Sequence, residues 1–121
     1  MNQRIYILED DPDIGLVLQY FLTEEGFDVQ LFASVDECQQ ALDIKLPDLC
    51  LFDIMLPDGD GITICNSIKR EHHAEVPVIL MSAGERESNV YQKSQADVFI
   101  SKPFDLDVLL NNIKRLIIAA A

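Results

Sequence analysis

The chain has 121 residues, 49% of them hydrophobic, which is enough to build one core of its own. Its 21 acidic residues outnumber the 9 lysines and arginines, and the formal net charge is -12. Such a charge argues against direct binding to nucleic acid or to an anionic membrane, because both require a positive patch on the protein.

The first half of the chain predicts two strand–helix units. A strand over 4–8 precedes a helix over 13–25, whose apolar residues recur on one face. Gly26 is placed to end this helix, since glycine is common just past a helix C-terminus. A strand over 27–32 then precedes a helix that Ser34 is expected to cap, with Glu37 three residues later, and that runs to about Leu42.

The second half continues this alternation. Strands are expected over 49–52, 78–81 and 98–101, and helices over 62–68 and 86–94 and after Asp105, with a turn-rich loop over 57–61. Repeated units of this length indicate parallel strands joined by right-handed crossovers. The sequence therefore predicts an α/β fold with a doubly wound, five-stranded parallel sheet, helices on both faces, and one domain spanning residues 1–121.

Polar residues follow directly on four of the apolar strands. They are Glu9 and Asp10 after the first strand, then Asp53, Ser82 and Lys102. In open α/β sheets, ligands bind outside the carboxyl ends of the strands. Because the strands are predicted to be parallel, we expect these five side chains to converge at one edge of the sheet.

Three consecutive acids, Glu9, Asp10 and Asp11, follow the first strand. Neighbouring carboxylates repel by on the order of 1–4 kcal/mol per pair at about 4 Å, so the cluster favours a bound hard cation, and a small set of oxygen ligands suits Mg²⁺. The alternative is an acid-rich helix start, which the helix dipole favours. Asp11, followed by Pro12, fits that alternative, whereas we assign Glu9 and Asp10 to a metal site.

Asp53 is a single carboxylate at the end of a strand predicted to be buried on both faces. A carboxylate can act as a nucleophile and form an acyl phosphate. The charge on the phosphoryl oxygens then needs fixed cations, which Lys102 and Mg²⁺ would supply, and Ser82 would donate a hydrogen bond. The alternatives are a solvated loop lysine for Lys102 and a turn-forming serine for Ser82.

Two other patterns suggest metals but fail on spacing. The Asp58–Gly61 segment is similar to part of a calcium loop, yet Leu56 and Ser67 stand where that loop needs acids. His72 and His73 are adjacent, so on a helix they point in different directions, and cations near a helix C-terminus are the ordinary explanation. Neither pattern predicts a site.

The cysteines predict neither a disulfide framework nor a zinc site. There are three of them, an odd number, and no pair has C-x-x-C spacing: Cys38, Cys50 and Cys65. Free thiols are typical of a reducing compartment, and no signal peptide or membrane-length apolar run is present. We therefore expect a cytoplasmic protein that does not contact a membrane.

Taken together, these motifs resemble the receiver domain of bacterial two-component response regulators over essentially the whole chain. The matching segments are 7–12 (ILEDDP), 53–61 (DIMLPDGDG), 77–83 (PVILMSA) and 102–104 (KPF). Each motif is modest alone, but in this order and spacing they are highly specific. The resemblance implies the doubly wound strand order 2-1-3-4-5.

The resemblance also implies a role for individual residues. Asp53 would be the phosphoacceptor, with Lys102 and Ser82 as its partners in catalysis. Glu9, Asp10, Asp53 and the backbone carbonyl of Met55 would hold Mg²⁺, with Asp10 a direct ligand and no other cofactor bound. Ser82 and Phe99 would form the switch pair, and the Lys102–Pro103 peptide bond would be cis.

The function implied is a phosphorylation switch. A sensor histidine kinase or phosphotransfer protein would phosphorylate Asp53, which would change the surface formed by helix 4, strand 5 and helix 5. That surface would contact an effector domain, a downstream protein or a second copy of the chain, with no nucleic acid bound by this domain. The chain would act only on its own phosphorylation and dephosphorylation, and so would not be an enzyme in the usual sense.

Some residues depart from the family pattern. Gln95 stands where glycine is common, Ser82 replaces threonine and Phe99 replaces tyrosine. Neither Met55 nor Gly84 can orient a water through its side chain, so we expect slow self-dephosphorylation. A half-life of seconds or less for the phosphorylated Asp53, with no phosphatase present, would contradict this.

Three other functions compete with the switch. The main alternative is an interaction module of the same fold that works without phosphorylation. A haloacid-dehalogenase-like phosphatase would need a second aspartate where Met55 stands. A flavodoxin-like electron carrier would need small and hydroxyl residues, instead of Glu9, Asp10 and Asp11, to surround a phosphate.

Overall fold

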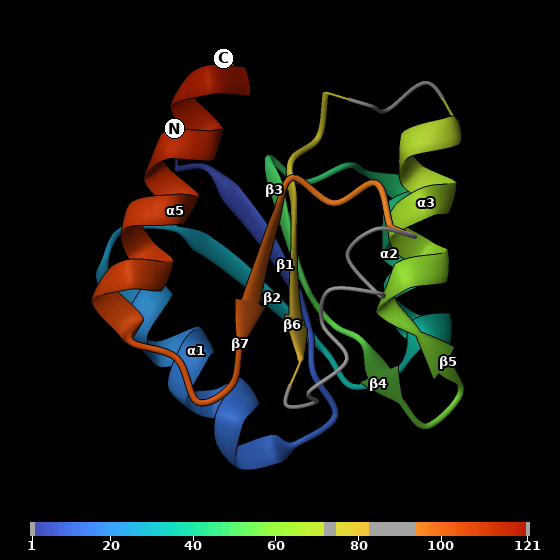
Figure 1. Cartoon of the computed structure of the whole chain (residues 1–121), viewed down its shortest axis with the longest axis horizontal. Helices are drawn as coiled ribbons and strands as arrows, with labels where there is room; N and C mark the ends of the chain where they lie inside the picture. The colour runs from blue at the N-terminus through green and yellow to red at the C-terminus, as the bar shows by residue number, and fades with distance from the viewer. Residues whose placement is uncertain (1, 72–74, 83–93, 121) are drawn as a thin grey trace.

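Five parallel strands form the central sheet of the computed structural model, which describes residues 2–71, 75–82 and 94–120 (Figure 1). The strands are β1 (Arg4–Leu8), β2 (Asp28–Phe32), β3 (Leu49–Asp53), β6 (Val78–Ser82) and β7 (Val98–Ser101). Their order across the sheet is β2-β1-β3-β6-β7, and each neighbouring pair is parallel. The predicted α/β class and the strand order 2-1-3-4-5 are confirmed.

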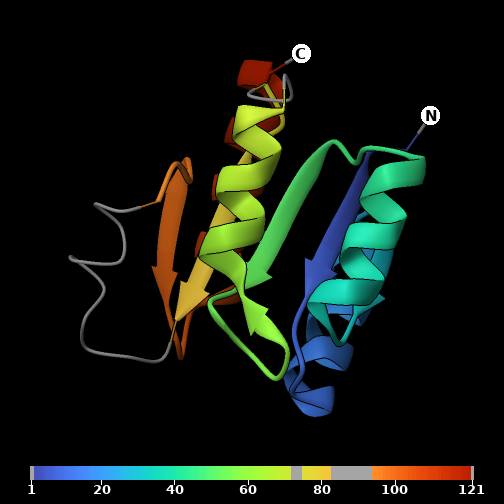
Figure 2. The same ribbon diagram turned by 90° about the vertical axis from the view of Figure 1, so that its right-hand side faces the viewer.

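The described helices cover both faces of this sheet. Helices α1 (Pro12–Glu24) and α5 (Leu106–Ala120) lie on one face, and α2 (Val35–Ile44) and α3 (Gly61–Arg70) lie on the other (Figures 1 and 2). The helix expected over 86–94 falls outside the described residues except for Ser94, which is not helical, and His72, His73 and Gly84 also lie outside them. No helix in the described part of the chain is long and apolar enough to cross a bilayer.

Each face of the sheet has its own hydrophobic core, because successive side chains of a strand point to opposite faces. In β3, Leu49 and Leu51 pack toward α1 and α5, whereas Cys50 and Phe52 pack toward α2 and α3. All four side chains are fully buried, which explains why this strand is an unbroken apolar run. Asp53 continues the same strand and is itself 7% exposed.

Local signals set the helix ends as predicted. Ser34 accepts a hydrogen bond from the Glu37 backbone N–H at 3.2 Å and so caps α2. Gly26, just past α1, has a φ of 95°, which glycine adopts without the steric cost of a side chain. Asp11 caps α1 by accepting from the Asp13 N–H at 2.9 Å, so its side chain serves the helix start rather than the metal group.

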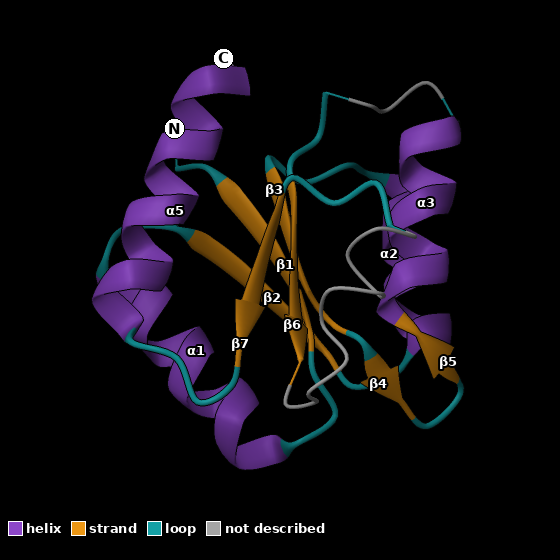
Figure 3. Cartoon of the chain, viewed as in Figure 1, coloured by secondary structure: helices purple, strands orange, loops and turns teal. Residues whose placement is uncertain are grey.

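The loop expected over 57–61 contains structure that the sequence did not reveal. Strands β4 (Met55–Leu56) and β5 (Gly59–Asp60) pair antiparallel and form a short ribbon between β3 and α3 (Figure 3). Two residues per strand are too few to show a periodic pattern. The ribbon begins two residues after Asp53.

Candidate functional site

Lys102 joins the acidic residues at the carboxyl edge of the sheet. Its Nζ lies 2.5 Å from Glu9 Oε1 and 3.0 Å from Asp53 Oδ2. Its backbone N–H donates to the Ser82 carbonyl at 2.7 Å, which fixes the chain just past β7 beside the end of β6. The Lys102–Pro103 peptide bond that follows is cis, as the resemblance implied. Residues from four separate strand ends thus meet at one place.

Burial controls the charges at this site. The Glu9 side chain is fully buried, and burial, together with the nearby Asp53 carboxylate, raises its pKa from 4.5 to about 7 despite the Lys102 ammonium. Burial disfavours the charged form of Lys102, but the Glu9 and Asp53 carboxylates more than offset this, and the pKa of Lys102 is raised. Lys102 is therefore a cation at neutral pH.

Three carboxylates are placed to share a metal ion. One oxygen each from Glu9, Asp10 and Asp53 lies within 4.8 Å of the others. Glu9 Oε2 is buried and has no hydrogen-bond partner among the described residues, so it is open to a ligand. Asp10 is exposed, and its side chain can meet a partly hydrated ion. This all-oxygen donor set fits Mg²⁺, which keeps several waters and takes few carboxylates.

The β4–β5 ribbon contacts the carboxylate of Asp53. The Met55 backbone N–H donates to Asp53 Oδ1 at 3.3 Å, on the opposite oxygen from the one that faces Lys102. The Met55 side chain is 77% exposed and points away from the core. Its position next to Asp53 is compatible with the carbonyl ligand that the resemblance implied, which stays a prediction.

The two expected switch residues lie on neighbouring strands. Ser82 ends β6, one residue past Met81, which pairs with Asp53 in the sheet. Phe99 in β7 pairs with Leu80 and packs, partly buried, against the core on the α2 and α3 side. Ser82 is therefore close to Asp53 in register, and Phe99 lies on the next strand. Their roles in switching stay predictions.

The cysteines take no part in the site. Cys38, Cys50 and Cys65 are free and buried in the core between the sheet and helices α2 and α3. Burial raises the pKa of Cys38 to about 12 and that of Cys65 to about 11. Such thiols are poor nucleophiles and poor metal ligands at neutral pH.

Sequence reasoning missed the role of the Asp58–Gly61 segment. Asp58 accepts hydrogen bonds from the backbone N–H groups of Val35 and Asp36 at the start of α2, at 2.9 and 3.1 Å. Asp60 caps α3 by accepting from the Thr63 N–H at 2.7 Å. Both acids are therefore helix caps, in agreement with the rejection of a calcium loop. Asp60 precedes an amphipathic run and could have been found, but the partners of Asp58 are far away in the sequence.

The chain is therefore a doubly wound α/β domain with a lysine and three converging carboxylates at the carboxyl edge of its sheet, where ligands bind in such folds. Comparison with known proteins gives the family. Residues 5–114 match the response regulator receiver domain, so the chain belongs to that family.

Curated relatives of the chain are longer proteins. It is 38% identical to the DNA-binding dual master transcriptional regulator RpaA of Synechocystis sp., over 94% of this chain and 48% of that protein. It is 32% identical to the phosphate regulon transcriptional regulatory protein PhoB of Rhizobium meliloti, over 97% of this chain and 53% of that protein. The chain thus spans about half the length of these relatives.

Solved structures share the fold over nearly the whole chain. The signal receiver domain of a signal transduction histidine kinase from Syntrophus aciditrophicus is 30% identical, with a TM-score of 0.90, over 97% of this chain and 91% of that one. The response regulator protein TrrA from Thermotoga maritima, solved with Mg²⁺ and BeF, is 25% identical, with a TM-score of 0.86, over 94% and 98%. The chain is a response regulator receiver domain of two-component systems.

Proposed function

We propose that Asp53 accepts a phosphoryl group from a phosphohistidine and so acts as a signalling switch. The observation that carries this proposal is the ion pair of 3.0 Å between Lys102 Nζ and Asp53 Oδ2, beside the carboxylates of Glu9 and Asp10. An Asp53 oxygen forms the new O–P bond while the N–P bond of the donor breaks. The electron pair of that bond stays on the imidazole nitrogen.

The residues around Asp53 divide the remaining work. Lys102, held as a cation by two carboxylates, offsets the charge on the phosphoryl oxygens. Glu9, Asp10, Asp53 and the Met55 carbonyl would hold Mg²⁺, which when bound neutralises phosphoryl charge. The Met55 N–H orients the carboxylate that attacks. The chain acts only on itself, so it is a switch rather than an enzyme with a released product.

The added phosphoryl group changes the surface of the domain. A phosphorylated side chain carries a charge of about −1.5 to −2, which attracts the Ser82 hydroxyl and lets Phe99 repack. The affected surface would comprise β7, α5 and the helix expected over 86–94, which lies outside the described residues except for Ser94. Its partner would be an effector domain, a downstream protein or a second copy of this chain, in the cytoplasm.

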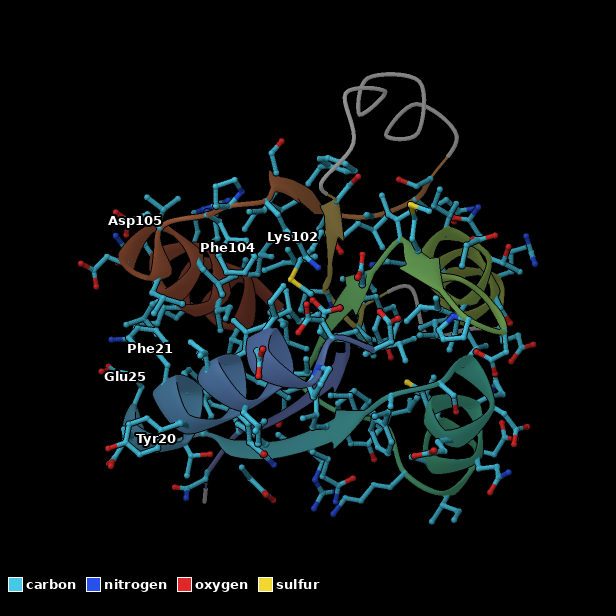
Figure 4. The ribbon with its side chains drawn as sticks, turned by 90° about the horizontal axis from the view of Figure 1, so that it is seen from below. Tyr20, Phe21, Glu25, Lys102, Phe104 and Asp105 are labelled. Carbon is cyan, nitrogen blue, oxygen red and sulfur yellow. The ribbon has the colours of Figure 1, made fainter. Side chains whose placement is uncertain are left out.

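We propose a docking place for the donor protein next to Asp53. An apolar cavity of about 570 Å³ lies between α1 and the segment from β7 to α5, and Lys102 lines it together with Ile14, Val17, Leu18, Pro103, Phe104 and Leu106. Figure 4 shows Lys102 and Phe104 on this segment, across from α1. Lys102 lines this cavity and also forms the ion pair with Asp53, so a donor seated there would lie beside the site. We therefore assign this cavity to the phosphodonor protein.

The test is phosphorylation of the purified chain by phosphoramidate with and without Mg²⁺. We expect an acid-stable, base-labile mass gain of one phosphoryl group on Asp53 that requires Mg²⁺ and is absent from Asp53→Asn. No mass gain under these conditions would leave the phosphorylation-independent interaction module as the better reading of the fold.

A further inference from the structure

The tip of the β4–β5 ribbon is tied to a helix that takes no part in the site. Asp58 Oδ1 accepts from the Val35 N–H at 2.9 Å, and Asp58 Oδ2 accepts from the Asp36 N–H at 3.1 Å. These N–H groups open α2 and have no partner within the helix. Both oxygens of one exposed carboxylate thus link the ribbon to the start of a helix 22 or 23 residues earlier in the chain.

The other end of the ribbon is packed against the phosphoacceptor segment. The Met55 N–H donates to Asp53 Oδ1 at 3.3 Å, and the Gly61 N–H donates to the Ile54 carbonyl at 3.0 Å. A Cβ added at Gly61 would lie 2.2 Å from the Asp53 carbonyl oxygen, so the start of α3, directly after β5, lies against the Asp53 backbone. Any displacement of the ribbon therefore reaches Asp53 and Met55.

The ribbon is too small to hold its own shape. Two strands of two residues each are marginal in water, and the ribbon depends on outside contacts for its position. Besides the bonds of Asp58, the tip is close-packed on α2 at Gly59, where an added Cβ would lie 3.2 Å from Val35 Cγ2. The clamp of Asp58 on the first turn of α2 is the polar contact that fixes this tip.

We propose that Asp58 is a positioning residue for phosphoryl transfer, which it supports by holding the Met55 backbone against the Asp53 carboxylate. Asp58 does not touch the reacting atoms and acts only through the ribbon. The inference rests on the proposed function of Asp53. It also explains why an acid that fits no calcium loop stands at this point of the chain.

The experiment compares two ways of uncapping the same helix. Asp58→Ala removes the clamp, whereas Ser34→Ala removes the other cap of α2, the bond from Ser34 Oγ to the Glu37 N–H, without touching the ribbon. For each variant, Mg²⁺ affinity is measured by calorimetry, the phosphoramidate rate by intact mass, and stability by thermal melting. Asp58→Asn, which keeps one acceptor oxygen, serves as a milder variant if Asp58→Ala does not fold.

We expect Asp58→Ala to lower both Mg²⁺ affinity and the phosphorylation rate by about tenfold, because groups that support metal ligands and reacting atoms have effects of this size. Asp58→Asn should fall between it and the wild type. Ser34→Ala should lower the melting temperature but leave affinity and rate close to wild type. If Asp58→Ala and Ser34→Ala both lose stability but neither loses Mg²⁺ affinity or phosphorylation rate, Asp58 is only a helix cap and the inference is overturned.

The outcome also separates this inference from the proposed function. If the wild type takes up no phosphoryl group, the proposed role of Asp53 is wrong. The Mg²⁺ affinities of wild type, Asp58→Ala and Ser34→Ala then still test whether Asp58 positions the site. If the wild type is phosphorylated and Asp58→Ala matches Ser34→Ala in both rate and affinity, only the positioning role of Asp58 fails.

Discussion

At the scale of single residues, the structure separates two acids that look alike in the sequence. Glu9 and Asp10 are neighbours, yet Glu9 is buried and bonded to Lys102, whereas Asp10 is exposed. Glu9 therefore helps to place the Lys102 ammonium, and one of its oxygens remains open among the described residues. The same ammonium reaches Asp53, so the carboxylates of Glu9 and Asp53 share one cation.

Removal of Lys102 should stop phosphoryl transfer. We expect Lys102→Ala to lower the rate of phosphorylation by phosphoramidate by on the order of 100-fold or more, since loss of one charge-stabilising donor has about this effect. The variant should also lose a few kcal/mol of stability at neutral pH, on the order of 3, because Glu9 and Asp53 remain buried without their cation. A rate within a few fold of wild type would mean that Lys102 is structural.

Glu9 should make stability depend on pH in metal-free buffer. Its pKa is about 7 in the folded state and 4.5 in its ordinary state, so between these values the folded protein binds more protons than the unfolded chain. The stabilisation from protonated Glu9 is complete below about pH 4.5 and is lost as the pH rises through 7. Chemical unfolding across pH 5 to 8 measures this loss of stability, and Glu9→Gln should remove on the order of 1–3 kcal/mol of the change over that range.

Asp10 should lower the stability of the metal-free protein and be needed for Mg²⁺ binding. Without Mg²⁺, we expect Asp10→Ala to raise the free energy of unfolding by up to about 1 kcal/mol, since one repelling and exposed charge is removed. Phosphorylation of Asp53 should be abolished, and Mg²⁺ should no longer raise the melting temperature. Thermal melts with and without Mg²⁺ check this, and a less stable variant in metal-free buffer would contradict the repulsion.

At the scale of elements, the close approach of β5 and α3 to β3 depends on one glycine. We expect Gly61→Ala to destabilise the fold by about 2 kcal/mol or more and to impair phosphorylation, because its Cβ would lie 2.2 Å from the Asp53 carbonyl oxygen. Gly26→Ala is the matched control. Its Cβ meets nothing within 4 Å, and its φ of 95° should cost about 1 kcal/mol without an effect on phosphorylation.

The urea midpoint and the phosphoramidate rate, measured for both glycine variants, decide this prediction. Equal losses of stability, with the rate of neither variant changed, would mean that the ribbon moves aside without disturbing Asp53.

Another element-scale feature ties the opposite edge of the sheet together. Lys69 of α3 donates to the Val76 carbonyl and to Asp97 Oδ2, both at 2.8 Å, and Asp97 Oδ2 also accepts from the Val78 N–H. The Lys69 side chain is 6% exposed. This network joins α3 to the starts of β6 and β7, far from Asp53, and thereby fixes the register of the two strands that carry Ser82 and Phe99.

At the scale of the whole molecule, the apolar cavity beside α1 should distinguish a protein donor from a small one. We expect Val17→Ala, a change in an exposed residue of this cavity, to slow phosphotransfer from a histidine kinase by about fivefold and to leave the phosphoramidate rate unchanged. The kinase used is the one that phosphorylates the wild-type chain fastest among a panel of histidine kinases.

The control for this docking face is Ile118→Ala on α5, which removes an even more exposed apolar side chain, 75% against 53% for Val17, outside the cavity. This variant should be phosphorylated at the wild-type rate by both the histidine kinase and phosphoramidate. If Val17→Ala and Ile118→Ala behave alike with the kinase, the donor docks elsewhere.

Sequence alone determined the five strands of the central sheet, their order by resemblance, the helix starts at Ser34 and after Asp105, and the convergence of Glu9, Asp10, Asp53 and Lys102 at one edge. These features follow from local patterns, because apolar runs, caps and strand ends are set by neighbouring residues and a parallel sheet brings its strand ends together. Only the tertiary structure decided that Glu9 is buried against Lys102 and that Asp58 binds the start of α2. Those contacts join residues far apart in the chain, and their partners are selected by packing rather than by any local pattern.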